Sequence, residues 1–245
     1  MSRYVSSDHR NFWSDAAVEA HWDRVAGIYV AENNKVKGAH DQRFTESLQH
    51  LDLKPGLRLL NITSRDAGAD AFIRERQPDC EITHAEISAG LMAEAEKLWP
   101  GICQIKLSTY SHLPFSNRQF NRILSLETLE HAADPLAFLA ELNRVATDDA
   151  RLVLSCPPAT SEIPYRLYTA LFGGHGEGPH RFLPSDEVKV MLRKTGWKLL
   201  LHKGTVLFPV GPEAFRDFGE RLINAFQGSV LSEMGIRQFY VCEKQ

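Results

Sequence analysis

Apolar and polar positions follow two different periods along most of this chain. Short, nearly continuous apolar runs rich in Leu, Ile and Val are bounded by polar or turn residues, which is typical of buried β-strands. Between them, apolar residues recur every three or four positions, as on one face of an α-helix. The predicted strands span 57–62, 80–86, 102–107, 120–126, 150–156, 197–208 and 237–242. The predicted helices span 66–76, 88–98, 134–146, 184–195 and 212–226, with shorter helical patterns at 15–22 and 41–48.

Residues that favour turns and helix ends lie at the boundaries of these elements. The turn residues 54–56, Lys-Pro-Gly, precede the first predicted strand. Asp66 and Ser88 are placed to cap the two helices that follow. Pro135 suits the first turn of a helix, and Gly196 suits a helix C-terminus. Strands that alternate with helices in this way predict an α/β fold, with a mostly parallel sheet covered by helices on both faces.

Composition and charge narrow the classes of partner. Of the 245 residues, 43% are apolar and 24% are charged, and the net charge is −3, which fits a globular protein without a basic surface for nucleic acid. No apolar run approaches the roughly 20 residues that span a bilayer, and the N-terminal stretch has no apolar core, so we expect no membrane span, no signal peptide and a cytoplasmic location. The four cysteines are far apart and form no CxxC pair, which favours reduced, buried thiols.

The most informative segment is 113–131. A Leu-Pro-Phe turn leads into the predicted strand 120–126, and the acidic, His-containing run from Glu127 to His131 follows at the end of that strand. This order, with the helix and strand after it, resembles the middle of class I S-adenosylmethionine (SAM)-dependent methyltransferases of the type 11 kind. The resemblance implies a Rossmann-like, seven-stranded, mostly parallel sheet with an antiparallel last strand. It also implies SAM as the cofactor.

We expect one domain over 1–245, because no repeat, low-complexity tract or linker interrupts the pattern. On the resemblance, 1–50 forms an N-terminal helical cap and 51–158 the cofactor-binding half. Residues 159–182 form an insertion or lid, and 183–245 form the C-terminal part of the sheet.

The loop after the first strand departs from the family's pattern. Ligands of open parallel sheets bind beyond the carboxyl ends of the strands, where this family has an acidic residue and a GxGxG loop. Here Asn61 stands at the acidic position, and the three glycine positions hold Thr63, Arg65 and Ala67, with Ser64 between the first two. Their side chains fill space that the methionine part of SAM needs. Retained SAM binding on a shifted backbone and loss of SAM both remain open.

Other cofactor contacts are implied at the ends of the next strands. Glu86 stands where the family places a carboxylate that binds both ribose hydroxyls. Ile87 and Met92 are placed to pack on adenine or, equally, in the core. Thr109 and Tyr110 lie where the family presents an acidic residue and a small residue to adenine, and the acidic residue is missing.

The strand at 120–126 ends beside the position expected for the reacting methyl group. Leu126 and Glu127 would border it, and His131 is either a general base or a support for the loop. Methyl transfer depends mainly on alignment of the reacting atoms, so a missing base does not exclude it.

The insertion supplies the candidate residues for an acceptor. Aromatic and basic groups there suit an acidic or glycosidic acceptor, or they pack the insertion onto the domain. These residues are Tyr165, Arg166, Tyr168, His175 and His180. The spacing of the two histidines matches no metal-binding motif, so we expect no metal.

Three functions follow from these observations. The first is SAM-dependent methyl transfer to a small-molecule or glycan-linked acceptor, which Glu86 and the run from Glu127 to His131 favour. The alternative is a catalytically degenerate methyltransferase fold that serves as a binding or scaffold protein for a partner, which the missing glycines favour. A third is binding of another nucleotide, with Ser64 and Arg65 holding an anion at a helix N-terminus.

Overall fold

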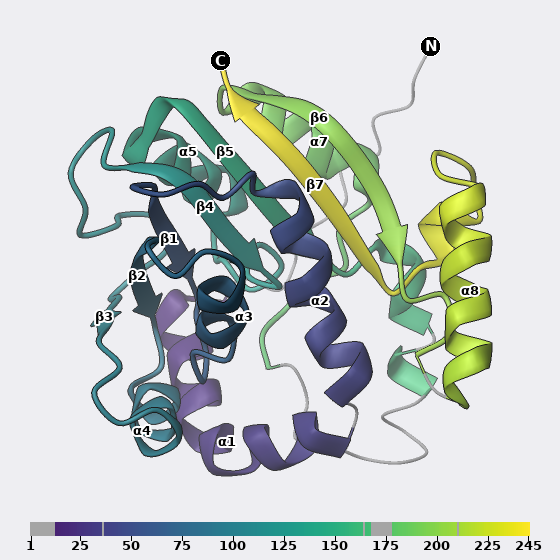
Figure 1. Cartoon of the computed structure of the whole chain (residues 1–245), viewed down its shortest axis with the longest axis horizontal. Helices are drawn as coiled ribbons and strands as arrows, with labels where there is room; N and C mark the ends of the chain where they lie inside the picture. The colour runs from purple at the N-terminus through teal and green to yellow at the C-terminus, as the bar shows by residue number, and fades with distance from the viewer. Residues whose placement is uncertain (1–12, 36, 164, 168–177, 210) are drawn as a thin grey trace.

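The computed structural model describes residues 13–35, 37–163, 165–167, 178–209 and 211–245. These residues form one seven-stranded sheet with the strand order β3-β2-β1-β4-β5-β7-β6 (Figure 1). Strands β1 to β5 pair in parallel, whereas β7 pairs antiparallel with both β5 and β6. The mostly parallel sheet and the antiparallel last strand that we predicted are therefore confirmed. The strands are β1 Arg58–Ile62, β2 Glu81–Glu86, β3 Gln104–Lys106, β4 Phe120–Leu126, β5 Ala146–Cys156, β6 Trp197–Thr205 and β7 Arg237–Lys244.

Helices cover both faces of the sheet, and a separate apolar cluster lies under each set. One cluster joins the sheet to α1, α4, α5 and α7, and the other joins it to α2 and α3, which lie in front of the sheet in Figure 1. The helices are α1 Asp15–Lys35, α2 Lys37–His50, α3 Ala69–Arg76, α4 Ala89–Leu98, α5 Pro135–Val145, α7 Ser185–Lys194 and α8 Glu213–Ala225.

Helix α1 crosses the carboxyl ends of the first strands. Its first residue, Asp15, accepts hydrogen bonds from the backbone N–H groups of Tyr110 (2.8 Å) and Ala133 (3.0 Å), in the loops after β3 and β4. Near the middle of this helix, Asp23 accepts from Ser88 Oγ (2.7 Å) and from the Gly90 N–H (2.9 Å) at the start of α4. The helix therefore covers the edge of the sheet where ligands of this fold class bind.

Most predicted element ends lie close to those observed, apart from α1, which continues well beyond residue 22, and β5, which begins at Ala146. Ser88 caps α4 through a hydrogen bond from the Leu91 N–H (3.1 Å), and Gly196 ends α7 at a φ of 81°, as predicted. The Asp66 cap was wrong, because α3 begins only at Ala69 and Asp66 accepts instead from the Gly68 N–H (3.3 Å) within the preceding turn.

Cys80, Cys156 and Cys242 are buried, Cys103 is exposed, and all four are free thiols. Within the described residues, no helix combines the length and the apolar character needed to cross a membrane. In the same residues, no three His, Cys, Asp or Glu side chains come together as a metal site would require.

Candidate functional site

The strand order reverses between β1 and β4, because β1 continues to β2 on one side and β4 to β5 on the other. Such a switch point is where open α/β sheets bind ligands, beyond the carboxyl ends of the strands. Three segments meet there. They are the loop 63–68 after β1, Glu86 at the end of β2, and Glu127 directly after β4.

The loop after β1 keeps a backbone that suits glycine. Thr63, Arg65 and Ala67 have φ angles of 55°, 53° and 58°, in the left-handed region. A side chain in that region costs roughly 1–2 kcal/mol per residue, and most for a β-branched residue such as Thr63. All three are buried. The positions that we matched to the family's glycines therefore have the conformation that glycine adopts most easily, although none of them is glycine.

Glu86 holds this loop through its carboxylate. One carboxylate oxygen accepts from the Arg65 N–H (2.7 Å), and the other accepts from the N–H groups of Ile87 (2.8 Å) and Ser88 (2.9 Å). The side chain is fully buried. A carboxylate bound by three N–H groups is well satisfied without any ligand. The ribose role of Glu86 stays a prediction, and it requires this network to open.

The Arg65 side chain turns toward α1. Its guanidinium lies 3.9 Å from the ring centroid of Trp22, and its Nη2 donates to the backbone carbonyl of Glu127 (3.3 Å). Only 5% of Arg65 is exposed. A cation stacked on an indole ring is attracted by the negative face of the ring. Arg65 therefore connects the loop after β1 to α1 and to the end of β4.

Asn61 and Ser64 are bound to neighbours within the sheet. The Asn61 amide lies 3.1 Å from His84 Nδ1, and His84 Nε2 in turn lies 2.9 Å from Asp70. Ser64 Oγ donates to the Ala85 carbonyl (3.2 Å) and accepts from Gln104 Nε2 (2.7 Å). Gln104 Nε2 also donates to the Arg65 carbonyl (2.9 Å), so it connects Ser64 and Arg65. The anion-binding role of Ser64 and Arg65 stays a prediction.

Glu127 joins helix α2 to strand β7. Its Oε2 accepts from Arg43 Nη1 (2.9 Å), and its Oε1 accepts from Arg237 Nε. These two guanidinium groups outweigh the effect of burial and lower the pKa of Glu127 to about 2. Arg43 also contacts His40, whose pKa burial and the Arg43 charge lower to about 4. At neutral pH Glu127 is therefore ionised and His40 is neutral.

His131 lies inside the same region. Its Nδ1 donates to the Pro179 carbonyl (2.9 Å), and its backbone carbonyl accepts from Trp13 Nε1 (2.8 Å). Burial and the nearby Arg65 guanidinium lower the pKa of His131 well below 6.5. The imidazole is neutral and is a weak base in this conformation.

Part of the predicted acceptor group comes together near His131. The rings of His131 and His180 are 6.2 Å apart, and the ring of Tyr165 lies 5.4 Å from that of His180. Arg166 is exposed and pairs with Glu162 (2.6 Å), away from this group. Tyr168 and His175 lie outside the described residues.

The predicted adenine contacts are packed against protein. Ile87 and Tyr110 are fully buried in the cluster beneath α1, and Thr109 Oγ1 donates to Asp15 (2.6 Å). Met92 is partly exposed on α4. Leu126 is buried in the cluster on the opposite face of the sheet.

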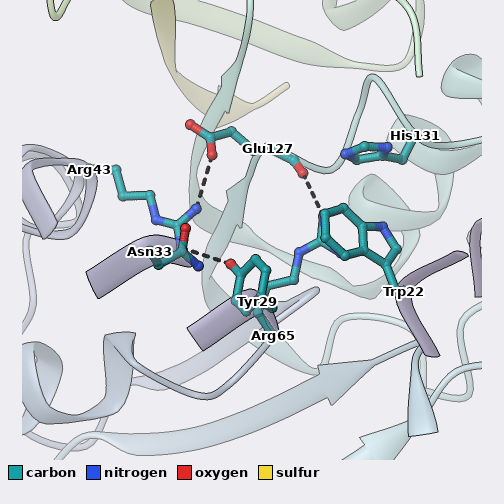
Figure 2. Close-up of a pocket in the computed structure, with 7 residues that line it drawn as sticks. All are labelled: Trp22, Tyr29, Asn33, Arg43, Arg65, Glu127 and His131. Atoms are coloured by element: carbon teal, nitrogen blue, oxygen red, sulfur yellow. Dashed lines mark hydrogen bonds and ion pairs between the residues drawn. The ribbon is translucent and has the colours of Figure 1, made fainter. Parts of the chain in front are cut away.

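A small cavity remains where these segments meet α1 and α2. It has a volume of about 60 Å³. Figure 2 shows the side chains that surround it, which are Trp22, Tyr29, Asn33, Arg43, Arg65, Glu127 and His131. Sequence reasoning did not identify Tyr29, Asn33, Arg43 or Arg237, because no motif marks single residues on polar helices and at the start of the last strand.

The comparisons with known proteins agree with the fold. Residues 67–154 match a family described as "Methyltransferase domain". The match begins at Ala67, so it leaves out β1 and most of the loop with left-handed residues. No curated protein matches the chain.

Solved structures with the same fold are numerous and distant in sequence. A SAM-dependent methyltransferase from Thermotoga maritima is 18% identical, with a TM-score of 0.65, over 93% of this chain and 100% of that chain. A chain from the complex of the Haloferax volcanii Trm112 methyltransferase activator with a methyltransferase is 14% identical, with a TM-score of 0.66, over 91% and 97%. The [4+2]-cyclase SpnF is 14% identical, with a TM-score of 0.67, over 94% and 96%. Residues 67–154 thus match a methyltransferase domain, and the fold of the described residues is the one that SAM-dependent methyltransferases adopt.

Proposed function

We propose that this protein is a binding protein on a methyltransferase fold, in which the chain's own residues close the cofactor cleft. The observation that carries this proposal is the state of Glu86. Its buried carboxylate already accepts three backbone N–H groups, so it has no exposed oxygen for the ribose hydroxyls of SAM.

Two further observations support a closed cleft. Arg65 and Thr63 place buried side chains where the family has glycines, and Arg65 is fixed on Trp22 of α1. The cavities that border this loop have volumes of about 60 and 10 Å³, whereas sites for cofactors and drug-sized ligands usually measure about 300–1,000 Å³. The residues in this conformation therefore do not fit SAM.

The fold itself leaves room for such a role. A structure with this fold is named a [4+2]-cyclase, and another comes from a complex with a protein activator. Function resides in the site rather than in the fold. We propose a protein partner for the binding role, as the complex suggests by analogy.

Isothermal titration of the full chain with SAM and with S-adenosylhomocysteine tests the proposal. We expect no heat of binding and no change in the melting temperature with either ligand. Micromolar affinity for either would contradict a closed cleft, because a ligand of that affinity at 100 times its Kd stabilises the folded state by about 2.7 kcal/mol.

Positive titrations would favour the second candidate, SAM-dependent methyl transfer to a small-molecule or glycan-linked acceptor. The family match and the glycine-like backbone at Thr63, Arg65 and Ala67 support it. On this hypothesis Arg65 and α1 move away, and Glu86 is released for the ribose. The acceptor would then lie beside the rings of His131, His180 and Tyr165.

A further inference from the structure

We propose that the cavity between α1, α2 and the end of β4 binds a small organic carboxylate. The proposal rests on the proposed function, because it assigns to a small anion a cleft that SAM does not occupy. The cavity of about 60 Å³ has room for a few water molecules, or for an anion of similar size such as acetate.

Two buried N–H groups on the walls lack an acceptor within the part of the chain that the structure describes. They are Asn33 Nδ2 and Arg43 Nε. The other nitrogens of Arg43 are used, because Nη1 donates to Glu127 (2.9 Å) and Nη2 contacts Tyr29 Oη (3.4 Å) and His40. Since buried donors in native proteins nearly always have an acceptor, an oxygen-bearing ligand is the natural partner for these two.

Two of the side chains that line the cavity carry guanidinium groups. Arg43 and Arg65 line it, and Arg237 pairs with the Glu127 carboxylate on its wall. The Glu127 carboxylate also lines it, so the lining itself holds two guanidinium groups and one carboxylate. The carboxylates of Asp66, whose charge acts on Arg43, and of Glu86, which accepts from the Arg65 N–H, lie farther out. The guanidinium groups on the lining attract an anion to the cavity.

The shape and chemistry of the walls select a carboxylate over a larger oxyanion. Trp22, Tyr29 and His131 supply ring surfaces, which suit the apolar end of a short organic acid (Figure 2). The guanidinium edge of Arg43 and the Asn33 amide supply the donors that carboxylate oxygens accept.

The test compares acetate binding to matched asparagine variants of the full chain at pH 7. Line broadening of ¹³C-labelled acetate and the melting temperature in sodium acetate are measured, with sodium chloride at equal ionic strength as the reference. For the wild type we expect acetate-specific broadening and a higher melting temperature. Asn33→Leu should weaken acetate binding about tenfold, as loss of one hydrogen bond to a charged group implies. Asn34→Leu, at the exposed neighbouring position, should leave it unchanged.

Arg43→Lys is a second variant, which keeps a positive charge beside Glu127 and removes Nε, and it should also weaken binding. If acetate acts no differently from chloride, or binds equally well to Asn33→Leu and Arg43→Lys, the inference is wrong. The SAM titration reports separately on the proposed function. If Asn33→Leu loses acetate binding and the wild type also binds SAM, the anion site is supported and the closed cleft is rejected.

Discussion

Three residues after β1 adopt the backbone of glycine while carrying side chains. Thr63, Arg65 and Ala67 all lie in the left-handed region, and Arg65 extends from there to Trp22. Mutation of these residues to glycine can therefore remove the side chains from the loop while its backbone conformation is kept.

Restoring the glycines should reopen the loop. In the variant Thr63→Gly/Arg65→Gly/Ala67→Gly, glycine adopts the positive φ angles without strain and removes the side chains from the cleft. We expect S-adenosylhomocysteine to give a measurable heat of binding to this variant and none to the wild type. Arg58→Gly, at the exposed start of β1, is the control and should bind no better than the wild type. A folded triple variant without binding would show that other residues close the cleft.

Glu86 should contribute to stability rather than to ligand binding. Glu86→Gln keeps the shape but replaces one of the two acceptor oxygens by an NH₂ group, which faces a backbone N–H. We expect a loss of about 2 kcal/mol in the free energy of unfolding, as is typical of hydrogen bonds to charged groups. Urea denaturation measures it, and Glu81→Gln at the exposed start of β2 should stay within about 0.5 kcal/mol of the wild type. An unchanged midpoint for Glu86→Gln would argue against the three-fold acceptor role.

Among the elements, the strands and the helices that pack on the sheet were predicted well. Both have a clear apolar period, and most of these helices begin or end at a residue that favours a helix terminus. The pattern at 15–22 predicted only the start of α1, which continues to Lys35. Its later residues are largely polar, and contacts with distant residues such as Ser88 and Arg65 hold it in place. Such long-range pairings leave no periodic signal in the sequence, so the contacts that hold α1 over the edge of the sheet were not predictable.

Two glycine substitutions should separate the stability of α1 from its docking. A Cβ on Gly90 would lie 3.0 Å from both Ala26 Cβ and Asp23 Cα, so Gly90→Ala pushes α1 away from α4. A Cβ on Gly27, inside α1, would meet nothing within 4 Å. We expect Gly90→Ala to destabilise the fold by about 1–3 kcal/mol and Gly27→Ala to stabilise it by about 0.5–1 kcal/mol. Urea unfolding measures both, with faster hydrogen exchange over α1 expected for Gly90→Ala. Equal effects of the two changes would exclude tight docking at Gly90.

At the scale of the molecule, Glu127 connects segments that are far apart in the sequence. It binds Arg43 on α2 and Arg237 on β7, the strand that lies between β5 and β6. The mostly parallel sheet with an antiparallel last strand was implied by the family resemblance. These ion pairs were not, because they depend on side chains that no motif marks.

This arrangement predicts a dependence of stability on pH. The pKa of Glu127 is about 2 in the folded protein and 4.5 for an ordinary glutamate, so between these values the unfolded state binds more protons. The stabilisation is complete above pH 4.5 and is lost as the pH falls toward 2. The pKa of His40 is lowered from 6.5 to about 4, so His40 adds a further loss of folding stability as the pH falls from 6.5 to 4.

We expect Glu127→Gln to flatten the decline in urea midpoint below pH 4.5. The exposed Glu75→Gln should keep the wild-type slope, and a wild-type slope in Glu127→Gln would contradict the assignment.

The stacking of Arg65 on Trp22 also changes how any ligand would have to enter. A group attached to the chain competes at a fixed local concentration, in the millimolar range or above for short tethers, however dilute the protein is. A diffusible ligand would therefore compete with the Arg65 side chain, and neither dialysis nor dilution removes that side chain. Under the proposed function, the residue at position 65 therefore sets the ligand concentration at which the cleft would be occupied.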